Sequence, residues 1–237
     1  MFIDEMKRAA EQYGIVLSDE QFGQFRRYCE LLVEWNEKMN LTAITGPQEV
    51  AVKHMIDSLT AYDPALFTGD VSMIDVGTGA GFPGLPLKIF CPSVRLTLMD
   101  SLNKRVKFLQ TVVDALGLQQ VECVHARAEE GARNKKYRER FDLAVSRAVA
   151  RLPVLCEYCL PFVRCGGHFL ALKGRDYEAE EREAEKAVRV LGGGQMKSRT
   201  VHLPGLEDKR AVIVITKAKP TPKSYPRKAG TPAKNPL

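Results

Sequence analysis

The chain has 237 residues, 45% of them hydrophobic, and a formal net charge of +6, which suits one α/β domain with appendages and excludes a disordered protein. No run approaches the roughly 18 apolar residues of a membrane span, and the acidic, amphipathic start MFIDEMKRAAEQYG does not resemble a signal peptide. Six cysteines without a dense framework fit a reducing compartment, so we expect a soluble cytoplasmic protein.

The first 65 residues are predicted to form a helical N-terminal segment that packs on the core. Ser18 and Gln21 have the spacing of a capping box, and apolar residues keep the helical period behind them to about Met39. A second helix is expected after a break, with Pro47 in its first turn.

Residues 66–216 alternate between apolar strands and helices. The helices are expected after the second strand and at 151–163 and 176–191. The strands are expected at 71–76, 94–100, 121–126, 141–148, 167–173 and 210–216. Strands that are apolar throughout and separated by helices predict an α/β fold: a Rossmann-like parallel sheet with helices on both faces.

A glycine-rich turn follows the first strand. Its glycines are Gly77, Gly79, Gly81 and Gly84, and the acidic Asp75 lies two residues before the first. A phosphate-binding P-loop is excluded because no lysine and serine or threonine follow, and the dinucleotide fingerprint is disfavoured because Phe82 replaces its third glycine. The spacing resembles the first motif of Rossmann-like S-adenosylmethionine (AdoMet) methyltransferases. Glycines with a purely structural role are the alternative.

The chemistry of AdoMet fits the residues that follow. A glycine turn lets backbone amides approach the methionyl group closely. The ribose requires a carboxylate at the end of the second strand, where Asp100 stands, although NAD enzymes use the same carboxylate. Ala128 and Glu129, after the third strand, stand where the adenine is expected to bind.

The end of the fourth strand, where such enzymes face the methyl acceptor, reads VSRAVAR. Enzymes that methylate exocyclic amines typically carry an (Asn/Asp)-Pro-Pro-aromatic motif there, so a ring nitrogen such as N7 of guanine is favoured. A ring nitrogen already offers a lone pair, and we identify no catalytic base. Arg147 and Arg151 are interpreted as pocket residues or phosphate anchors, with plain surface arginines as the alternative.

Two further groups are candidates for the substrate face. Lys104 and Arg105 occupy the first turn of a helix, where the dipole disfavours cations, which suggests a phosphate partner or merely an exposed surface. His54, Asp57 and Ser58 share one helix face and are expected either to cap the site or to include a buried, hydrogen-bonded histidine.

A metal site is not expected. Cys156 and Cys159 form a CxxC pair, but no second pair or histidine follows at zinc spacing, and the segment around them is apolar. We therefore interpret both as buried thiols.

The whole charge excess lies in the tail at 217–237, which has six basic residues, no acidic ones and five prolines. The prolines predict an extended arm that is neither helical nor a central strand. Such a basic arm suits nucleic acid, and Arg227 and Lys228 are candidate RNA contacts. A frayed, solubilising terminus is the alternative.

Together these motifs resemble the RsmG (glucose-inhibited division protein B) family of 16S ribosomal RNA guanine-7 methyltransferases. The resemblance runs through WNEKMNLTAIT, KHMIDSL, DVGTGAGFPGLPLKI, DSLNKRVKFL, RAEE, SRAVARL, LALKG and YPRKAGTPAKNPL. It implies methyl transfer from AdoMet to a guanine of 16S rRNA or the small ribosomal subunit.

The resemblance also implies cofactor contacts at Gly77, Phe82, Ala128, Glu129 and Arg147. The spacing argument adds Asp75, Gly79 and Asp100. Two alternatives stay open: a nicotinamide-dependent oxidoreductase, and a ribosome-binding assembly module that keeps the fold without turnover.

Overall fold

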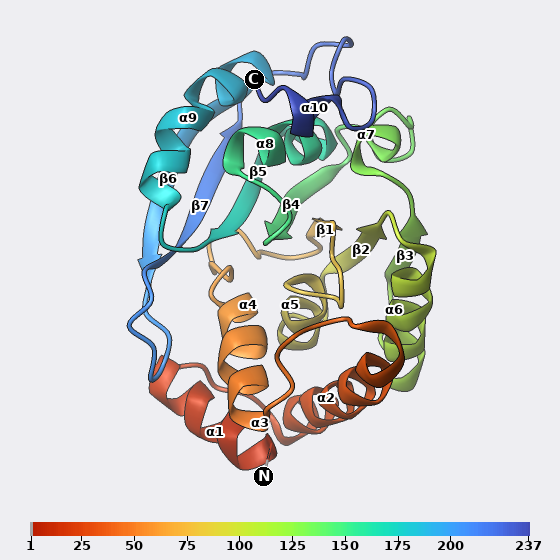
Figure 1. Cartoon of the computed structure of the whole chain (residues 1–237), viewed down its shortest axis with the longest axis vertical. Helices are drawn as coiled ribbons and strands as arrows, with labels where there is room; N and C mark the ends of the chain where they lie inside the picture. The colour runs from red at the N-terminus through yellow and green to blue at the C-terminus, as the bar shows by residue number, and fades with distance from the viewer. Residues whose placement is uncertain (1) are drawn as a thin grey trace.

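The computed structural model describes residues 2–237 and is built around one seven-stranded sheet (Figure 1). The strands are β1 (Ser72–Val76), β2 (Arg95–Asp100), β3 (Val121–His125), β4 (Phe141–Arg147), β5 (Val163–Lys173), β6 (Gly193–Val201) and β7 (Arg210–Lys217). Their order is β3-β2-β1-β4-β5-β7-β6. The order reverses between β1 and β4, and such a reversal opens a crevice at the carboxyl ends of parallel strands.

Helices cover both faces of the sheet. On one face lie α1 (Phe2–Tyr13), α2 (Asp19–Met39), α3 (Pro47–Glu49), the π-helix η1 (Val50–Ile56), α4 (Asp57–Leu59), α5 (Gly84–Phe90) and α6 (Asn103–Ala115). On the other lie α7 (Ala128–Gly131), α8 (Leu152–Cys159), the 3-10 helix η2 (Leu160–Phe162), α9 (Tyr177–Val190) and α10 (Thr231–Lys234). No helix in residues 2–237 is long and apolar enough to cross a bilayer.

Side chains of the central strands alternate between the two cores. Met73 and Leu143 pack on the face of the N-terminal helices, whereas their neighbours Ile74 and Ala144 pack on the face of α8. All four are buried, because helices cover the sheet on both sides. This explains why the strands are continuous apolar runs in the sequence.

The sheet is mixed, not wholly parallel as the sequence predicted. β7 pairs antiparallel with β5 and with β6, so it alone runs against the other six strands, and β1 to β5 pair in parallel. β7 is buried between its neighbours, and an apolar run has the same pattern in either direction. β6 was not predicted because, as an edge strand, it is largely polar and exposed.

The predicted capping box is confirmed at the start of α2. The Ser18 hydroxyl accepts a hydrogen bond from the Gln21 backbone N–H (3.2 Å), and the Gln21 side chain accepts one from the Ser18 N–H (2.9 Å). The Gln21 amide also donates to the carbonyls of Ile89 and Phe90 at the end of α5. One side chain thus caps α2 and docks it on α5.

The helix expected after Pro47 is only partly α-helical. A short α-turn leads into the seven-residue π-helix η1, which continues into α4. π-helical turns are rare and are frequent at functional sites. This one carries Lys53 and His54, both of which contact the strand ends described below.

The prediction of an extended C-terminal arm is wrong. The tail folds back on the α7–α8 side of the sheet and contains the short helix α10 (Figure 1). Pro232 is compatible with this helix because it occupies the first turn, where no N–H is needed. The three predicted segments therefore share hydrophobic cores: residues 1–65, 66–216 and 217–237. Both ends of the chain pack on the sheet domain.

We predict that Ser18→Ala lowers the free energy of unfolding by about 1 kcal/mol, the usual cost of a lost N-cap. Urea denaturation measures this directly. Ser18→Asp, which keeps an acceptor for the Gln21 N–H, is the control and should retain most of the stability. Equal losses in both variants would contradict a capping role.

Candidate active site

The loop after β1, residues 77–84, is held from below by Asp75. Its Oδ2 accepts hydrogen bonds from the Thr78 hydroxyl (2.7 Å) and the Gly84 N–H (2.8 Å). Asp75 is fully buried, and burial raises its pKa to about 7, against the opposing effect of these two donors. It lines neither cavity described below, so it shapes this glycine loop from beneath.

Two glycines permit close approaches around the loop. Gly77 has a φ of +71°, and a Cβ added there would lie 2.7 Å from a methyl group of Val149, in the segment after β4. A Cβ on Gly84 would lie 2.8 Å from Asp75 Oδ2. The glycine loop is therefore packed between the buried carboxylate and the chain leaving β4.

Two adjoining cavities form a cleft at the carboxyl ends of the strands. The loop cavity, of about 370 Å³, is lined by the glycine loop together with Thr42, His54, Asp100 and Arg147. The Glu129 cavity, of about 350 Å³, is lined by Ala128, Glu129, Tyr158, Gly230 and Ala233, among others. Both cavities share Gly77, Asp100, Ser101 and Val149. The cleft therefore has two lobes that meet at the end of β2.

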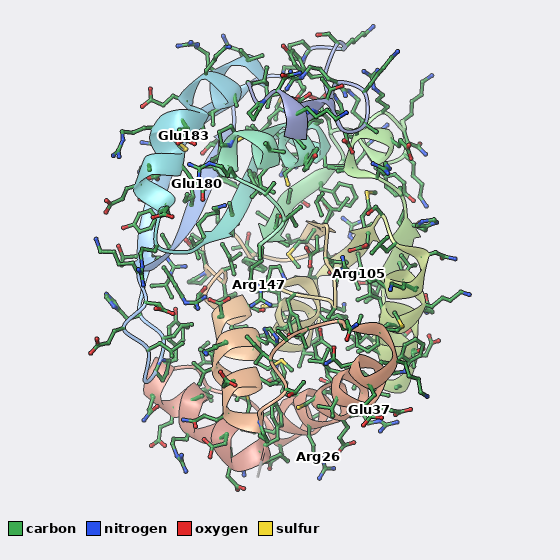
Figure 2. The ribbon with its side chains drawn as sticks, viewed as in Figure 1. Arg26, Glu37, Arg105, Arg147, Glu180 and Glu183 are labelled. Atoms are coloured by element: carbon green, nitrogen blue, oxygen red, sulfur yellow. The ribbon has the colours of Figure 1, made fainter. Side chains whose placement is uncertain are left out.

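Asp100 stands at the junction of the two lobes. One carboxylate oxygen accepts from the Gly79 N–H and the other from the Leu102 N–H, each at 2.9 Å. Arg105 lies 3.5 Å from the same carboxylate and lines the loop cavity, so it faces the cleft (Figure 2). Lys104, its neighbour, is exposed. Each oxygen of Asp100 keeps a lone pair for a further donor.

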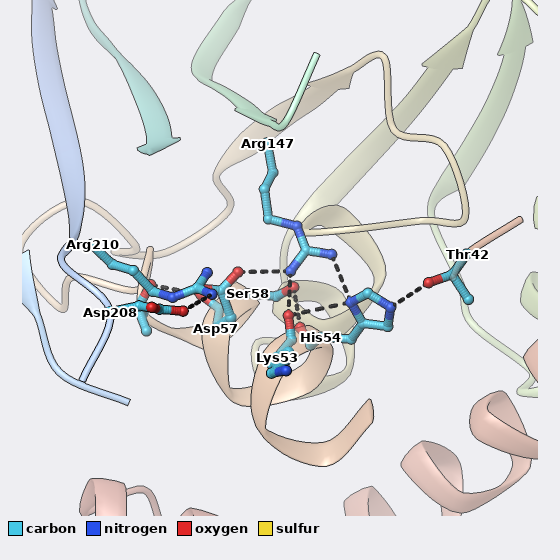
Figure 3. A network of polar contacts seen from close by, with 9 residues as sticks. Thr42, Lys53, His54, Asp57, Ser58, Arg147, Asp208 and Arg210 are labelled. Atoms are coloured by element: carbon cyan, nitrogen blue, oxygen red, sulfur yellow. Dashed lines mark hydrogen bonds and ion pairs between the residues drawn. The ribbon is translucent and has the colours of Figure 1, made fainter. Parts of the chain in front are cut away.

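Arg147, at the end of β4, is bound by the N-terminal helices (Figure 3). One terminal nitrogen donates to Asp57 (2.7 Å) and to the Lys53 carbonyl (3.0 Å). The other lies 3.3 Å from His54 Nδ1, and the guanidinium stacks 4.9 Å from the centre of the Phe82 ring. These contacts fix a cation over the glycine loop.

His54 is buried and lines the loop cavity, whereas Asp57 and Ser58, which share its predicted helix face, line neither lobe of the cleft. Its ring stacks on Phe82 at 4.5 Å, and Nε2 lies 2.8 Å from the Thr42 hydroxyl. Nδ1 lies 3.3 Å from the Arg147 guanidinium, which only donates, and 3.2 Å from the Lys53 carbonyl, which only accepts, so these two contacts favour opposite tautomers. Burial, helped by Arg147, lowers the pKa of His54 to about 4. Ser58 points away and donates to the His54 carbonyl.

The structure brings most of the candidate residues to the cleft, but not all of them. Gly77, Gly79, Phe82, Asp100, Arg105 and Arg147 line the loop cavity, and Ala128 and Glu129 line the other. Arg151 lies outside both and pairs with Glu183 of α9 on the exposed surface. Arg227 is held by Glu157, and Lys228 is exposed.

Sequence reasoning missed three contributors to the cleft. Tyr28 of α2 stacks on Phe82 and donates its hydroxyl to the Ala80 carbonyl, which supports the glycine loop from the N-terminal layer. Thr42 lines the loop cavity and lies in the motif WNEKMNLTAIT, to which no role was assigned from the sequence. Gly230 comes from the tail, which was predicted either to contact nucleic acid or to be a frayed terminus, and not to line the cleft.

The CxxC pair consists of free, fully buried thiols, as predicted, and burial raises the pKa of both. Within residues 2–237, no three histidine, cysteine or acidic side chains gather in a way that could hold a metal ion.

The sheet order and the glycine-loop cleft define a Rossmann-like methyltransferase fold. A solved structure of precorrin-6y C5,15-methyltransferase from Geobacter metallireducens matches with a TM-score of 0.52 at 13% identity, covering 69% of this chain and 87% of that chain. At this identity the likeness shows the fold alone.

The sequence identifies the family. The model of the GidB family, rRNA small subunit methyltransferase G, matches residues 21–211. The ribosomal RNA small subunit methyltransferase G of Exiguobacterium sibiricum is 52% identical, covering 97% of this chain and 96% of the relative. That of Clostridium botulinum (strain Eklund 17B / Type B) is 50% identical, covering 100% and 99%. The chain belongs to the GidB family.

The lowered pKa of His54 predicts a pH-dependent stability. An unfolded histidine titrates at 6.5 and the folded one at about 4, so between these values only the unfolded chain binds the proton. Acidification from pH 7 to pH 5 should therefore cost about 2 kcal/mol through His54.

Denaturant unfolding of wild type and His54→Gln at both pH values measures this contribution. The variant should lose about 2 kcal/mol less on acidification than wild type does. His202→Gln, which changes an exposed histidine, is the matched control and should behave as wild type. A parallel pH response of wild type and His54→Gln would contradict the assignment.

Proposed function

We propose that this protein transfers the methyl group of AdoMet to N7 of a guanine in small-subunit ribosomal RNA. The observation that carries the proposal is the two-lobed cleft at the strand ends in a chain of the GidB family. The cleft has Asp100 at its junction, as a ligand with a central ribose requires. The named function of the relatives, methylation of small-subunit rRNA, supports the substrate class.

The residues of the cleft fit AdoMet, which supplies an electrophilic methyl group on a sulfonium. We propose that Asp100 binds the ribose, and that the methionyl group lies in the loop cavity against Gly77, Gly79 and Phe82. Arg147 lines the same cavity, and we propose that it contacts the methionyl group while it keeps its ion pair with Asp57.

The adenine then falls in the Glu129 cavity beside the backbone of Ala128 and Glu129. Asp75 contributes indirectly, because its buried carboxylate holds the loop that approaches the methionyl group.

For the methyl acceptor, catalysis requires positioning of the guanine base more than transfer of a proton. N7 of guanine attacks with its own lone pair, so no side chain must remove a proton first. Asp57 and the Lys53 carbonyl fix Arg147, and His54 is neutral at pH 7. We propose that this fixed, partly buried wall orients the base for in-line attack and excludes water.

For the RNA surface we propose Lys104 and Lys228 as phosphate contacts, because both are exposed. Arg105, Arg151 and Arg227 are each paired with a carboxylate of the chain itself. They would have to exchange these partners to bind a phosphate.

The decisive experiment combines purified protein, methyl-labelled AdoMet and small subunits, or their rRNA, from cells that lack this modification. Digestion should release label as 7-methylguanosine from one site. Label on adenine, cytosine or protein would overturn the proposal. Binding of NAD with no affinity for AdoMet would favour an oxidoreductase, and AdoMet binding without turnover would favour an assembly module.

We predict that Asp100→Ala weakens AdoMet binding about tenfold or more, because the ribose loses its acceptor and the Gly79 N–H loses its partner. Isothermal titration calorimetry with AdoMet measures the dissociation constant. Asp114→Ala removes an exposed carboxylate from α6 and is the matched control. Unchanged affinity in Asp100→Ala would remove Asp100 from the cofactor site.

A further inference from the structure

The C-terminal tail, residues 218–237, forms part of the cleft. After β7 the chain crosses the ends of α8 and α7 and places α10 beside them (Figure 1). Gly230 and Ala233 line the Glu129 cavity opposite Ala128. This lobe therefore has one wall from the segment after β3 and another from the last residues of the chain.

A buried ion pair fixes the tail beside the cavity. Glu157 of α8 is 0% exposed, and its carboxylate accepts from Arg227 through the backbone N–H (2.7 Å), Nε (3.0 Å) and Nη2 (2.5 Å). A buried carboxylate without a partner is strongly unfavourable, so Glu157 holds Arg227 in place. Gly230 follows three residues later.

The carboxylate of Glu129 provides a second tether. Its Oε1 accepts a hydrogen bond from the Gly230 N–H at 2.8 Å, and the residue is 6% exposed. The side chain thus binds the tail, which leaves the backbone of Ala128 and Glu129 as the natural partner of a ligand in the cavity.

Arginines of the main body bind the start of the tail through its carbonyl groups. Arg138 donates to the carbonyls of Tyr225 (2.9 Å) and Thr221 (2.8 Å), and Arg133 donates to that of Pro226 (2.6 Å). Because the acceptors are backbone carbonyls of the tail, two arginines can hold a segment whose own side chains are basic.

We propose that the tail is a wall of the cofactor site that sets the affinity for the adenosine part of AdoMet, with Glu157 and Glu129 as its anchors. This inference rests on the proposed function and deepens it, since it assigns the adenine-binding surface to two distant segments. The chemical class recognised by this wall is an adenine nucleoside.

The test fills the cavity from the tail without breaking an anchor. Ala233 is exposed at the cavity wall, so Ala233→Phe projects a ring into the space proposed for the adenine. Ala229→Phe adds the same ring at an exposed position outside the cavity and is the matched control.

Calorimetric titration of the full chain with AdoMet measures the affinity for the whole cofactor. Titration with 5′-methylthioadenosine measures the affinity for its adenosine part. Ala233→Phe should weaken both ligands about tenfold or more, whereas Ala229→Phe should stay within about twofold of wild type. Equal affinities of Ala233→Phe and wild type would overturn the inference.

A second variant tests the anchor. Arg227→Ala should weaken AdoMet at a temperature where circular dichroism shows it folded, whereas Lys223→Ala, an exposed change in the same tail, should not. If Arg227→Ala does not fold, the result with Ala233→Phe decides. Wild type that binds no AdoMet would reject the proposed function itself, whereas wild-type binding with unchanged variants would reject only the role of the tail.

Discussion

The ion pair between Arg147 and Asp57 connects the N-terminal helices to the strand ends at the cleft. Arg147 ends a central strand, Asp57 begins α4, and their side chains are 13% and 7% exposed. The second oxygen of Asp57 accepts from Arg210 at the start of β7, so one carboxylate of the helical layer binds two strands (Figure 3). Removing one member of such a pair would leave a buried charge uncompensated. The interaction therefore fixes the N-terminal helices over the strand ends and makes them part of the cleft.

Two buried acidic residues that look alike in the sequence occupy different positions at the glycine loop. Asp75 lies one residue before the end of β1 and Asp100 ends β2, and both bind backbone amides of the same loop. Asp75 lies beneath the loop, where desolvation raises its pKa, whereas Asp100 lines both cavities. Position relative to the glycine loop, and not residue type, separates a structural carboxylate from a candidate ligand.

The sequence predicted the features that depend on local spacing. The capping box at Ser18, the glycine loop and the apolar strands each follow from short patterns, and the structure has them. It did not predict the polar edge strand β6, the direction of β7 or the π-helical geometry of η1. These depend on what packs against a segment after the chain has folded. The same holds for Tyr28, which reaches the loop from a helix far away in sequence.

The tail shows most clearly what amino-acid composition alone does not predict. Its basic residues suggested nucleic acid as a partner, but the carboxylate that Arg227 binds is the chain's own Glu157, and Lys217 donates internally to the Leu160 carbonyl. Net charge does not reveal that carbonyl groups of the same tail bind arginines of the main body. Four lysines of the tail remain exposed: Lys219, Lys223, Lys228 and Lys234. Because the Gly230 N–H binds Glu129 only two residues from Lys228, a phosphate bound there would act on the backbone that walls the cavity proposed for the adenine. A single segment thus carries exposed lysines and also lines the cleft.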